Sequence, residues 1–201
     1  MENFSNYISD VFFLLSPSMR VVFIFLSSFA EGLPVIGSFF PGGSIALLIG
    51  SLSFSGYISL SLAIFVVTMG NFLGDVVGFF IGRKFKHTKW FKRISEKEKH
   101  QKSWELFDKH IILIVLFTKV IPIIRSLPSL FAGARGVKVL KYFLFSFIGS
   151  LIWAVLGVYG GNMIAMVLGK NAVAFIFCLV IVLSTGPYLV KRFRNRKRNI
   201  K

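Results

Sequence analysis

Cysteine and histidine are scarce in this sequence, and this scarcity excludes several kinds of site. The one cysteine, Cys178, lies in an apolar run, so a disulfide or a cysteine-based metal site within one chain is excluded. The histidines show no HExxH or similar ligand spacing; they are His87, His100 and His110. We therefore expect no metal and no cofactor.

Acidic residues are also few, with 8 Asp and Glu against 24 Lys and Arg, which gives a net charge of +16. The basic residues cluster at 83–102 and 191–201, and both clusters lie beside apolar segments. This distribution is typical of the positive-inside rule for membrane proteins. It favours a membrane protein over a nucleic-acid-binding protein, the other common kind of basic chain.

Apolar residues are abundant: 55% of the chain is hydrophobic and the mean hydropathy is +0.73. A soluble domain of this size does not need so much apolar surface, so we predict an all-α integral membrane protein. Three segments are long enough to cross a bilayer; they are 57–82, 142–169 and 172–190. We expect one membrane domain over 1–190, followed by a basic tail at 191–201.

Two stretches break the apolar regions with prolines, glycines and a charge. They are E-G-L-P-V-I-G-S-F-F-P-G-G-S at 31–44 and K-V-I-P-I-I-R-S-L-P at 119–128. Proline removes a helix donor, and the apolar pieces beside the breaks are too short to span about 30 Å of hydrocarbon. We predict re-entrant helical hairpins at about 21–55 and about 107–136. The predicted breaks are Pro34, Pro41, Gly42, Pro122 and Pro128.

The charge distribution predicts the topology. The basic loop 83–106 and the tail belong in the cytoplasm. The first hairpin then enters from outside and its span runs inward, whereas the second hairpin and span run the opposite way. The prediction is two inverted repeats of hairpin plus transmembrane helix, followed by one further transmembrane helix. The protein would be a multi-pass protein of the cell membrane with a cytoplasmic C-terminus.

The first predicted span carries a glycine face. Its glycines recur every four residues, which is typical of close helix packing in membranes; they are Gly70, Gly74, Gly78 and Gly82. The glycine face could pack against another helix of the same chain or against a second copy in a homodimer, and the sequence leaves both possibilities open. Beside this face lies Asp75, for which an ion pair or cap in the bundle and a role in ion coupling are both open.

Five linked motifs make residues 20–170 resemble the DedA family, also called SNARE-associated or VTT-domain proteins. The motifs lie at Glu31, Pro34, Pro41, Gly42 and Ser44; at Gly74, Asp75, Phe79, Gly82 and Arg83; at Phe117, Lys119, Ile121, Pro122 and Arg125; at Ala132, Gly133 and Arg135; and at Gly149 and Trp153. The resemblance implies the re-entrant hairpin fold and transport of lipid phosphates, undecaprenyl phosphate in bacteria. It also implies proton- or sodium-coupled function for Glu31 and Arg125. Many members have an acid where this chain has Gly43, and an arginine where it has Lys119.

The resemblance implies a flippase for lipid phosphates, with undecaprenyl phosphate as the expected substrate and H+ or Na+ as the coupling ion. Arg125, Lys119 and Arg135 would bind the phosphate, and Glu31 and Asp75 would couple the ion. The alternatives are an uncoupled phospholipid scramblase and a non-transporting scaffold, in which Glu31 forms a fixed ion pair with Arg125 or Lys119. Arg135 would then be an interfacial anchor. No nucleophile or base stands beside the predicted phosphate site, so we expect no enzyme.

Overall fold

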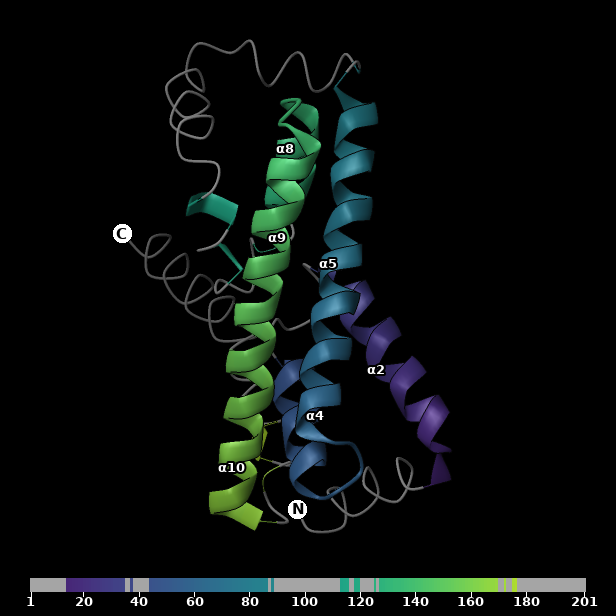
Figure 1. Ribbon diagram of the computed structural model, residues 1–201, viewed down its shortest axis with the longest axis vertical. Helices are drawn as coiled ribbons and strands as arrows, with labels where there is room; N and C mark the ends of the chain where they lie inside the picture. The colour runs from purple at the N-terminus through teal and green to yellow at the C-terminus, as the bar shows by residue number, and fades with distance from the viewer. Residues whose placement is uncertain are drawn as a thin grey trace, which may run out of the picture.

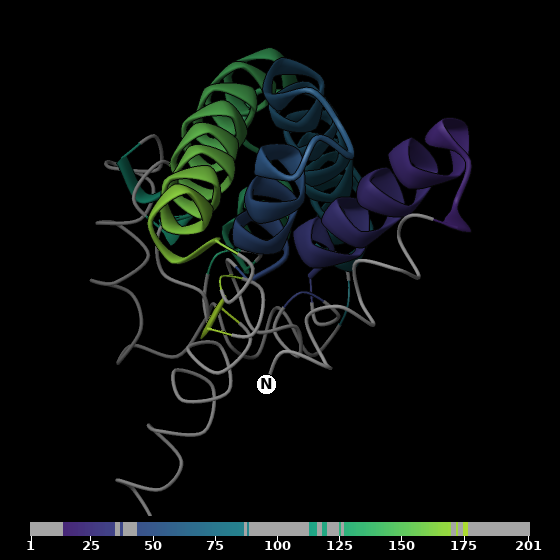
Figure 2. The same ribbon diagram turned by 90° about the horizontal axis from the view of Figure 1, so that it is seen from below.

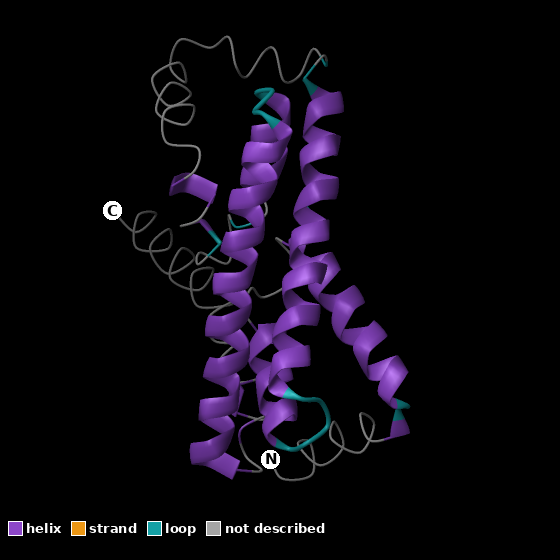
Figure 3. Cartoon of the chain, viewed as in Figure 1, coloured by secondary structure: helices purple, strands orange, loops and turns teal. Residues whose placement is uncertain are grey.

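The computed structural model describes residues 14–34, 37, 44–86, 88, 113–115, 118–119, 125, 127–169, 172 and 175–176. Within these ranges the chain is helical and contains no strand (Figure 3). Three of the predicted breaks lie outside the described residues, namely Pro41, Gly42 and Pro122. The tail and most of the predicted span 172–190, loop 83–106 and hairpin 107–136 lie outside them too.

Two helical stretches are long and apolar enough to cross a membrane. The first is α5, Leu60–Phe85, and the second runs over Val139–Leu168; each contains an 18-residue window with a mean hydropathy of 1.9. The second consists of α9 (Val139–Ala154), a π-helical segment η1 (Val155–Tyr159) and α10 (Gly160–Leu168), which follow one another as one long rod (Figure 1). Both stretches lie within three residues of the predicted spans at each end.

Shorter helices accompany these two. They are α2 (Pro17–Gly32), α4 (Ser44–Phe54) and α8 (Leu127–Ala134). Helix α2 begins at a serine cap, because Ser16 Oγ accepts a bond of 3.3 Å from the backbone N–H of Met19. Pro34 lies two residues beyond the end of α2, and Pro128 lies in the first turn of α8, where proline is tolerated.

Helix α5 is the centre of the described bundle, with α2 packed along one part of it and α8 along another (Figure 1). Its glycine face makes both contacts. A methyl group at Gly74 would lie 2.6 Å from the carbonyl oxygen of Phe29 on α2. One at Gly82 would lie 2.0 Å from the carbonyl oxygen of Leu130 on α8. The glycine face therefore packs within the chain, so a homodimer would need another surface.

A matching contact joins α4 to the end of the α9–α10 rod. Gly161 of α10 meets the carbonyl oxygen of Leu47, and Gly50 of α4 meets the carbonyl oxygen of Val158; a methyl group at either glycine would lie 2.0 Å from that oxygen. Seen from below, α4 lies between α2 and this rod (Figure 2). Each long helical stretch therefore packs closely against a short helix, α5 against α8 and the α9–α10 rod against α4. In both pairs each helix places a glycine against the backbone of the other.

Two apolar cores flank the middle of α5. One core includes Ile24, Val67 and Val158, and the other surrounds Phe79 and Tyr142. The turns of α5 between Val67 and Phe79 carry polar side chains instead. The buried polar residues Asn71 and Asp75 of α5 therefore lie between the two cores.

Candidate functional site

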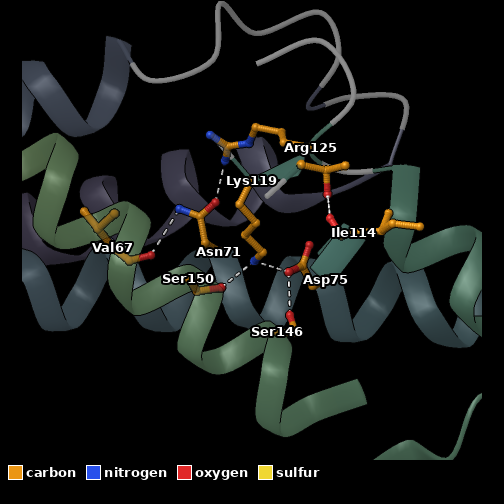
Figure 4. Close-up of polar contacts among 9 residues, drawn as sticks. Val67, Asn71, Asp75, Ile114, Lys119, Arg125, Ser146 and Ser150 are labelled. Carbon is orange, nitrogen blue, oxygen red and sulfur yellow. Dashed lines mark hydrogen bonds and ion pairs between the residues drawn. The ribbon is translucent and has the colours of Figure 1, made fainter. Parts of the chain in front are cut away.

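Four buried charges meet beside the middle of α5, and we call them the four-charge cluster; Figure 4 shows three of them, Asp75, Lys119 and Arg125. The four are Glu31, Asp75, Lys119 and Arg125, with exposed fractions of 0%, 3%, 6% and 5%. Glu31 comes from the last turn of α2 and Asp75 from α5, whereas the two cations come from the stretch that leads to α8. The cluster holds both acidic residues of the described part of the chain.

Arg125 is held by three helices. Its Nη1 donates to Glu31 Oε1 at 2.6 Å on α2, and its Nη2 donates to Asn71 Oδ1 on α5. The guanidinium carbon lies 5.2 Å from the ring centroid of Trp153 on α9, which is within cation–π range. Asn71 Nδ2 donates to the carbonyl oxygen of Val67 at 3.2 Å, so the other end of the amide, its oxygen, is turned to the guanidinium.

Lys119 forms the second half of the cluster. Its Nζ pairs with Asp75 Oδ2 and also donates to Ser150 Oγ at 2.6 Å on α9. Ser146, one turn before Ser150, donates its hydroxyl to the same carboxylate oxygen of Asp75 at 2.6 Å. Asp75 therefore links α5 to α9 as well as to the lysine (Figure 4).

The close packing of α2 and α5 brings these side chains together. A methyl group at Gly32 would lie 2.6 Å from the carbonyl oxygen of Asn71, so the backbone after Glu31 touches the backbone that carries Asn71. The two carboxylates and two cations balance in charge. Balance matters because a buried charge that loses its partner costs several kcal/mol.

Of the predicted phosphate-binding and coupling residues, the cluster contains all but Arg135. Arg135 directly follows α8 and is exposed. It lies at the end of α8 where Gly133 contacts the backbone of Phe79 and Arg83, beyond Asp75 along α5. Of the two ion pairs that the sequence left open for Glu31, the one with Arg125 forms.

Sequence reasoning missed several residues of the site. Ser146 and Ser150 lie on α9 in a charge-free segment, Trp153 on the same helix was named only as part of a family motif, and Asn71 carries no charge that would single it out. The available signal was spacing, since two serines four residues apart in an apolar span share a helix face.

The sequence model described as the VTT domain matches residues 40–163, which is more than half of the chain. The chain belongs to the VTT domain family. Within the matched range lie Asp75, Lys119 and Arg125, and Glu31 precedes it.

Three relatives of this VTT-domain protein come from Escherichia coli strain K12. Protein DedA is 25% identical over 184 residues, which cover 87% of this chain and 82% of DedA. Inner membrane protein YqjA is 28% identical over 169 residues, with coverage of 80% and 74%. Inner membrane protein YghB is 28% identical over 134 residues, with coverage of 65% and 61%. No solved structure matches the chain.

The relatives and the helices agree on a membrane protein. Two of the relatives are named as inner membrane proteins, and the chain has two helical stretches that are apolar and long enough to span. None of the three is named as an enzyme.

Proposed function

We propose that this VTT-domain protein transports lipid phosphates across the bilayer, with undecaprenyl phosphate as substrate and H+ or Na+ as the coupling ion. The observation that carries the proposal is the four-charge cluster, in which two cations and two carboxylates are buried between apolar cores. Ionisable residues inside a membrane protein are costly to bury and are functional by default. A polyprenyl tail stays in the lipid, so only the head group needs such a polar site.

Coupling follows from charge balance. When Glu31 and Asp75 are ionised, each of the cations Lys119 and Arg125 already has a carboxylate partner. Binding H+ at the carboxylates, or Na+ beside them, frees the cations to hold a phosphate by charge-assisted hydrogen bonds. A phosphate monoester carries −1.5 to −2 at pH 7, so about two protons for each phosphate would keep the site neutral.

The proposed site has its second carboxylate at Asp75. Many family members carry an acid where this chain has Gly43, so a two-carboxylate scheme needs its second acid elsewhere in this chain. Asp75 fills that need because it pairs with Lys119, much as Glu31 pairs with Arg125. Arg135, exposed after α8, would collect phosphate at the cytoplasmic surface before it reaches the cluster.

We extend the proposal to the membrane topology. Residues 1–190 would form one domain of two inverted hairpin-plus-helix repeats and a third span at 172–190, with a cytoplasmic C-terminus. The reciprocal glycine contacts support this, because α8 grips α5 in the same way that α4 grips the α9–α10 rod. Each long helix is thus held by a short helix from the other half, as expected for halves related by a pseudo-two-fold axis.

A second candidate is an uncoupled scramblase or a scaffold. The observation that favours it is that each cation already has a carboxylate partner within the chain, as a fixed structural core would have. In neither candidate does the protein act as an enzyme.

The test is translocation of polyprenyl phosphate in proteoliposomes, with and without a pH or sodium gradient. The native chain is compared with the variants Arg125→Ala and Glu31→Gln. We expect gradient-dependent movement that Arg125→Ala abolishes, and movement by Glu31→Gln that no longer responds to the gradient. Movement that ignores the gradient in the native chain would indicate the scramblase, and no movement would indicate the scaffold.

A further inference from the structure

Trp153 has a buried polar group that the charge cluster does not use. Trp153 lies three residues after Ser150 on α9, and the guanidinium carbon of Arg125 lies over its ring, 5.2 Å from the ring centroid. Its Nε1 is buried, and no hydrogen-bond partner for it exists in the described part of the chain. Buried indole N–H groups usually have a hydrogen-bond acceptor, so the unsatisfied N–H of Trp153 needs an explanation.

The position of this donor relates it to Arg125. The guanidinium already donates to Glu31 and Asn71, and its carbon lies over the indole ring of Trp153. A ligand that displaces Glu31 would therefore find the guanidinium still oriented by Asn71 and by the indole ring. The backbone also leaves α-helical geometry two residues later, at η1, and π-helical segments occur frequently at functional sites.

We propose that Trp153 is a further binding residue of the anion site: its Nε1–H donates to an oxygen of the phosphate that replaces Glu31 on Arg125. This inference rests on the proposed function. An indole N–H only donates hydrogen bonds, so the ligand that satisfies it must present an acceptor. A phosphate oxygen meets that need while its charge is held by Arg125 and Lys119.

Fluorescence offers a direct test because Trp153 is one of only three tryptophans. Replacing the other two (Trp90→Phe and Trp104→Phe) leaves Trp153 as the sole reporter in the purified full-length chain. We would titrate it with farnesyl phosphate, with farnesol as a control that lacks the phosphate, and with inorganic phosphate. We expect a saturable change in Trp153 emission with farnesyl phosphate and none with farnesol. A response to inorganic phosphate as well would support the same site and make the free anion a sufficient ligand.

Affinity then separates the donor from the ring. In calorimetric titrations with farnesyl phosphate, Trp153→Phe keeps an aromatic face for Arg125 but loses the N–H. Since a hydrogen bond to a charged group contributes about 1.5–3 kcal/mol, we expect Kd to rise roughly 10- to 100-fold. Trp153→Leu loses the ring as well, and we expect a larger loss.

Two results would overturn the inference without touching the proposed function. One is native affinity in Trp153→Phe, whether or not Trp153→Leu is weakened, because the N–H would then contribute nothing. The other is silent Trp153 emission while calorimetry detects binding. If the native chain binds no farnesyl phosphate at all, the proposed function fails, and this inference fails with it. Equal apparent melting temperatures of native chain and variants exclude misfolding as the cause of a loss.

Discussion

At the residue scale, Asp75 is held by two side chains at once, because Lys119 and Ser146 both contact its Oδ2. Removing the lysine charge in Lys119→Met leaves this carboxylate buried and uncompensated. Such a loss costs about 3–5 kcal/mol, so we expect a clear drop in the apparent melting temperature in detergent. The double variant Lys119→Met with Asp75→Asn should recover most of the loss. If the double variant is as unstable as the single one, the pair does not act as a unit.

Two buried serines provide a matched pair for stability. Ser150 accepts a hydrogen bond from Lys119, whereas the hydroxyl of fully buried Ser28 has no hydrogen-bond partner among the described residues. We expect Ser150→Ala to destabilise by about 1.5–3 kcal/mol, since it removes a bond to a charged group. Ser28→Ala should be neutral or stabilising, because it removes an unsatisfied polar group. Thermal unfolding of both variants would contradict this expectation if their order were reversed.

The sequence was informative about which residues carry charge, but it left open whether Glu31 pairs with Arg125 or Lys119 and named no partner for Asp75. Each residue of the four-charge cluster stands out as a charged residue in an apolar setting. Its pairing depends on the approach of α2 to α5, which brings Glu31 and Asn71 to the same guanidinium. The serines of α9 give no such signal, because uncharged residues are common in any spanning helix, and Trp153 stood out only as a motif residue with no partner implied.

At the element scale, two adjacent glycines of α10 differ in what surrounds them. A methyl group at Gly161 would lie 2.0 Å from the Leu47 carbonyl oxygen, but one at Gly160 would meet only Leu47 Cδ2, at 3.6 Å. We expect Gly161→Ala to force α10 and α4 apart and to destabilise by about 1–3 kcal/mol. Gly160→Ala should be neutral or stabilise by about 0.5–1 kcal/mol, because alanine favours a helix. Melting of the two variants side by side tests this, and equal losses would count against the close contact.

Glycine spacing predicted a packing face on α5 but not the helices that occupy it. On that face Gly74 packs against α2 and Gly82 packs against α8. The glycine spacing does not predict which helices these partners are. The predicted span 57–82 stopped before Arg83 and Lys84, yet α5 continues to Phe85. Long basic side chains can reach polar surroundings while their backbone stays helical, so charge alone does not end a helix. Nothing in the sequence indicated η1.

At the scale of the whole molecule, basic residues gather at one end of the described bundle. This end holds the last turn of α5 and the turn between α8 and α9 (Figure 1); its basic residues are Arg83, Lys84, Lys86, Arg135, Lys138 and Lys141. At the opposite end, Arg20 lies over the ring of Tyr57 and donates to its carbonyl oxygen. The positive-inside rule therefore assigns the first end to the cytoplasm.

Cysteine accessibility tests this orientation, because replacing Cys178 by serine removes the single native thiol. In that background, Ser55→Cys places a thiol in the exposed turn before α5, and Lys138→Cys places one in the exposed turn before α9. The 26 residues of α5 cover about 39 Å, which is enough to separate these turns across a bilayer. An impermeant maleimide added to intact cells should label Ser55→Cys alone, and both variants should react after lysis.

A buried position provides the control. Ala63 on α5 is fully buried, so the thiol of Ala63→Cys should not react with the maleimide in intact or in lysed cells. If Lys138→Cys reacts in intact cells and Ser55→Cys does not, the orientation is the reverse of the one that the charges favour. If both Ser55→Cys and Lys138→Cys react in intact cells, α5 does not separate the two turns across the membrane. The proposed topology of two inverted repeats would then be wrong. Labelling from opposite sides would place the four-charge cluster between two aqueous phases, because Asp75 lies on the helix that joins the two turns. A site in that position is what alternating access of a phosphate head group requires.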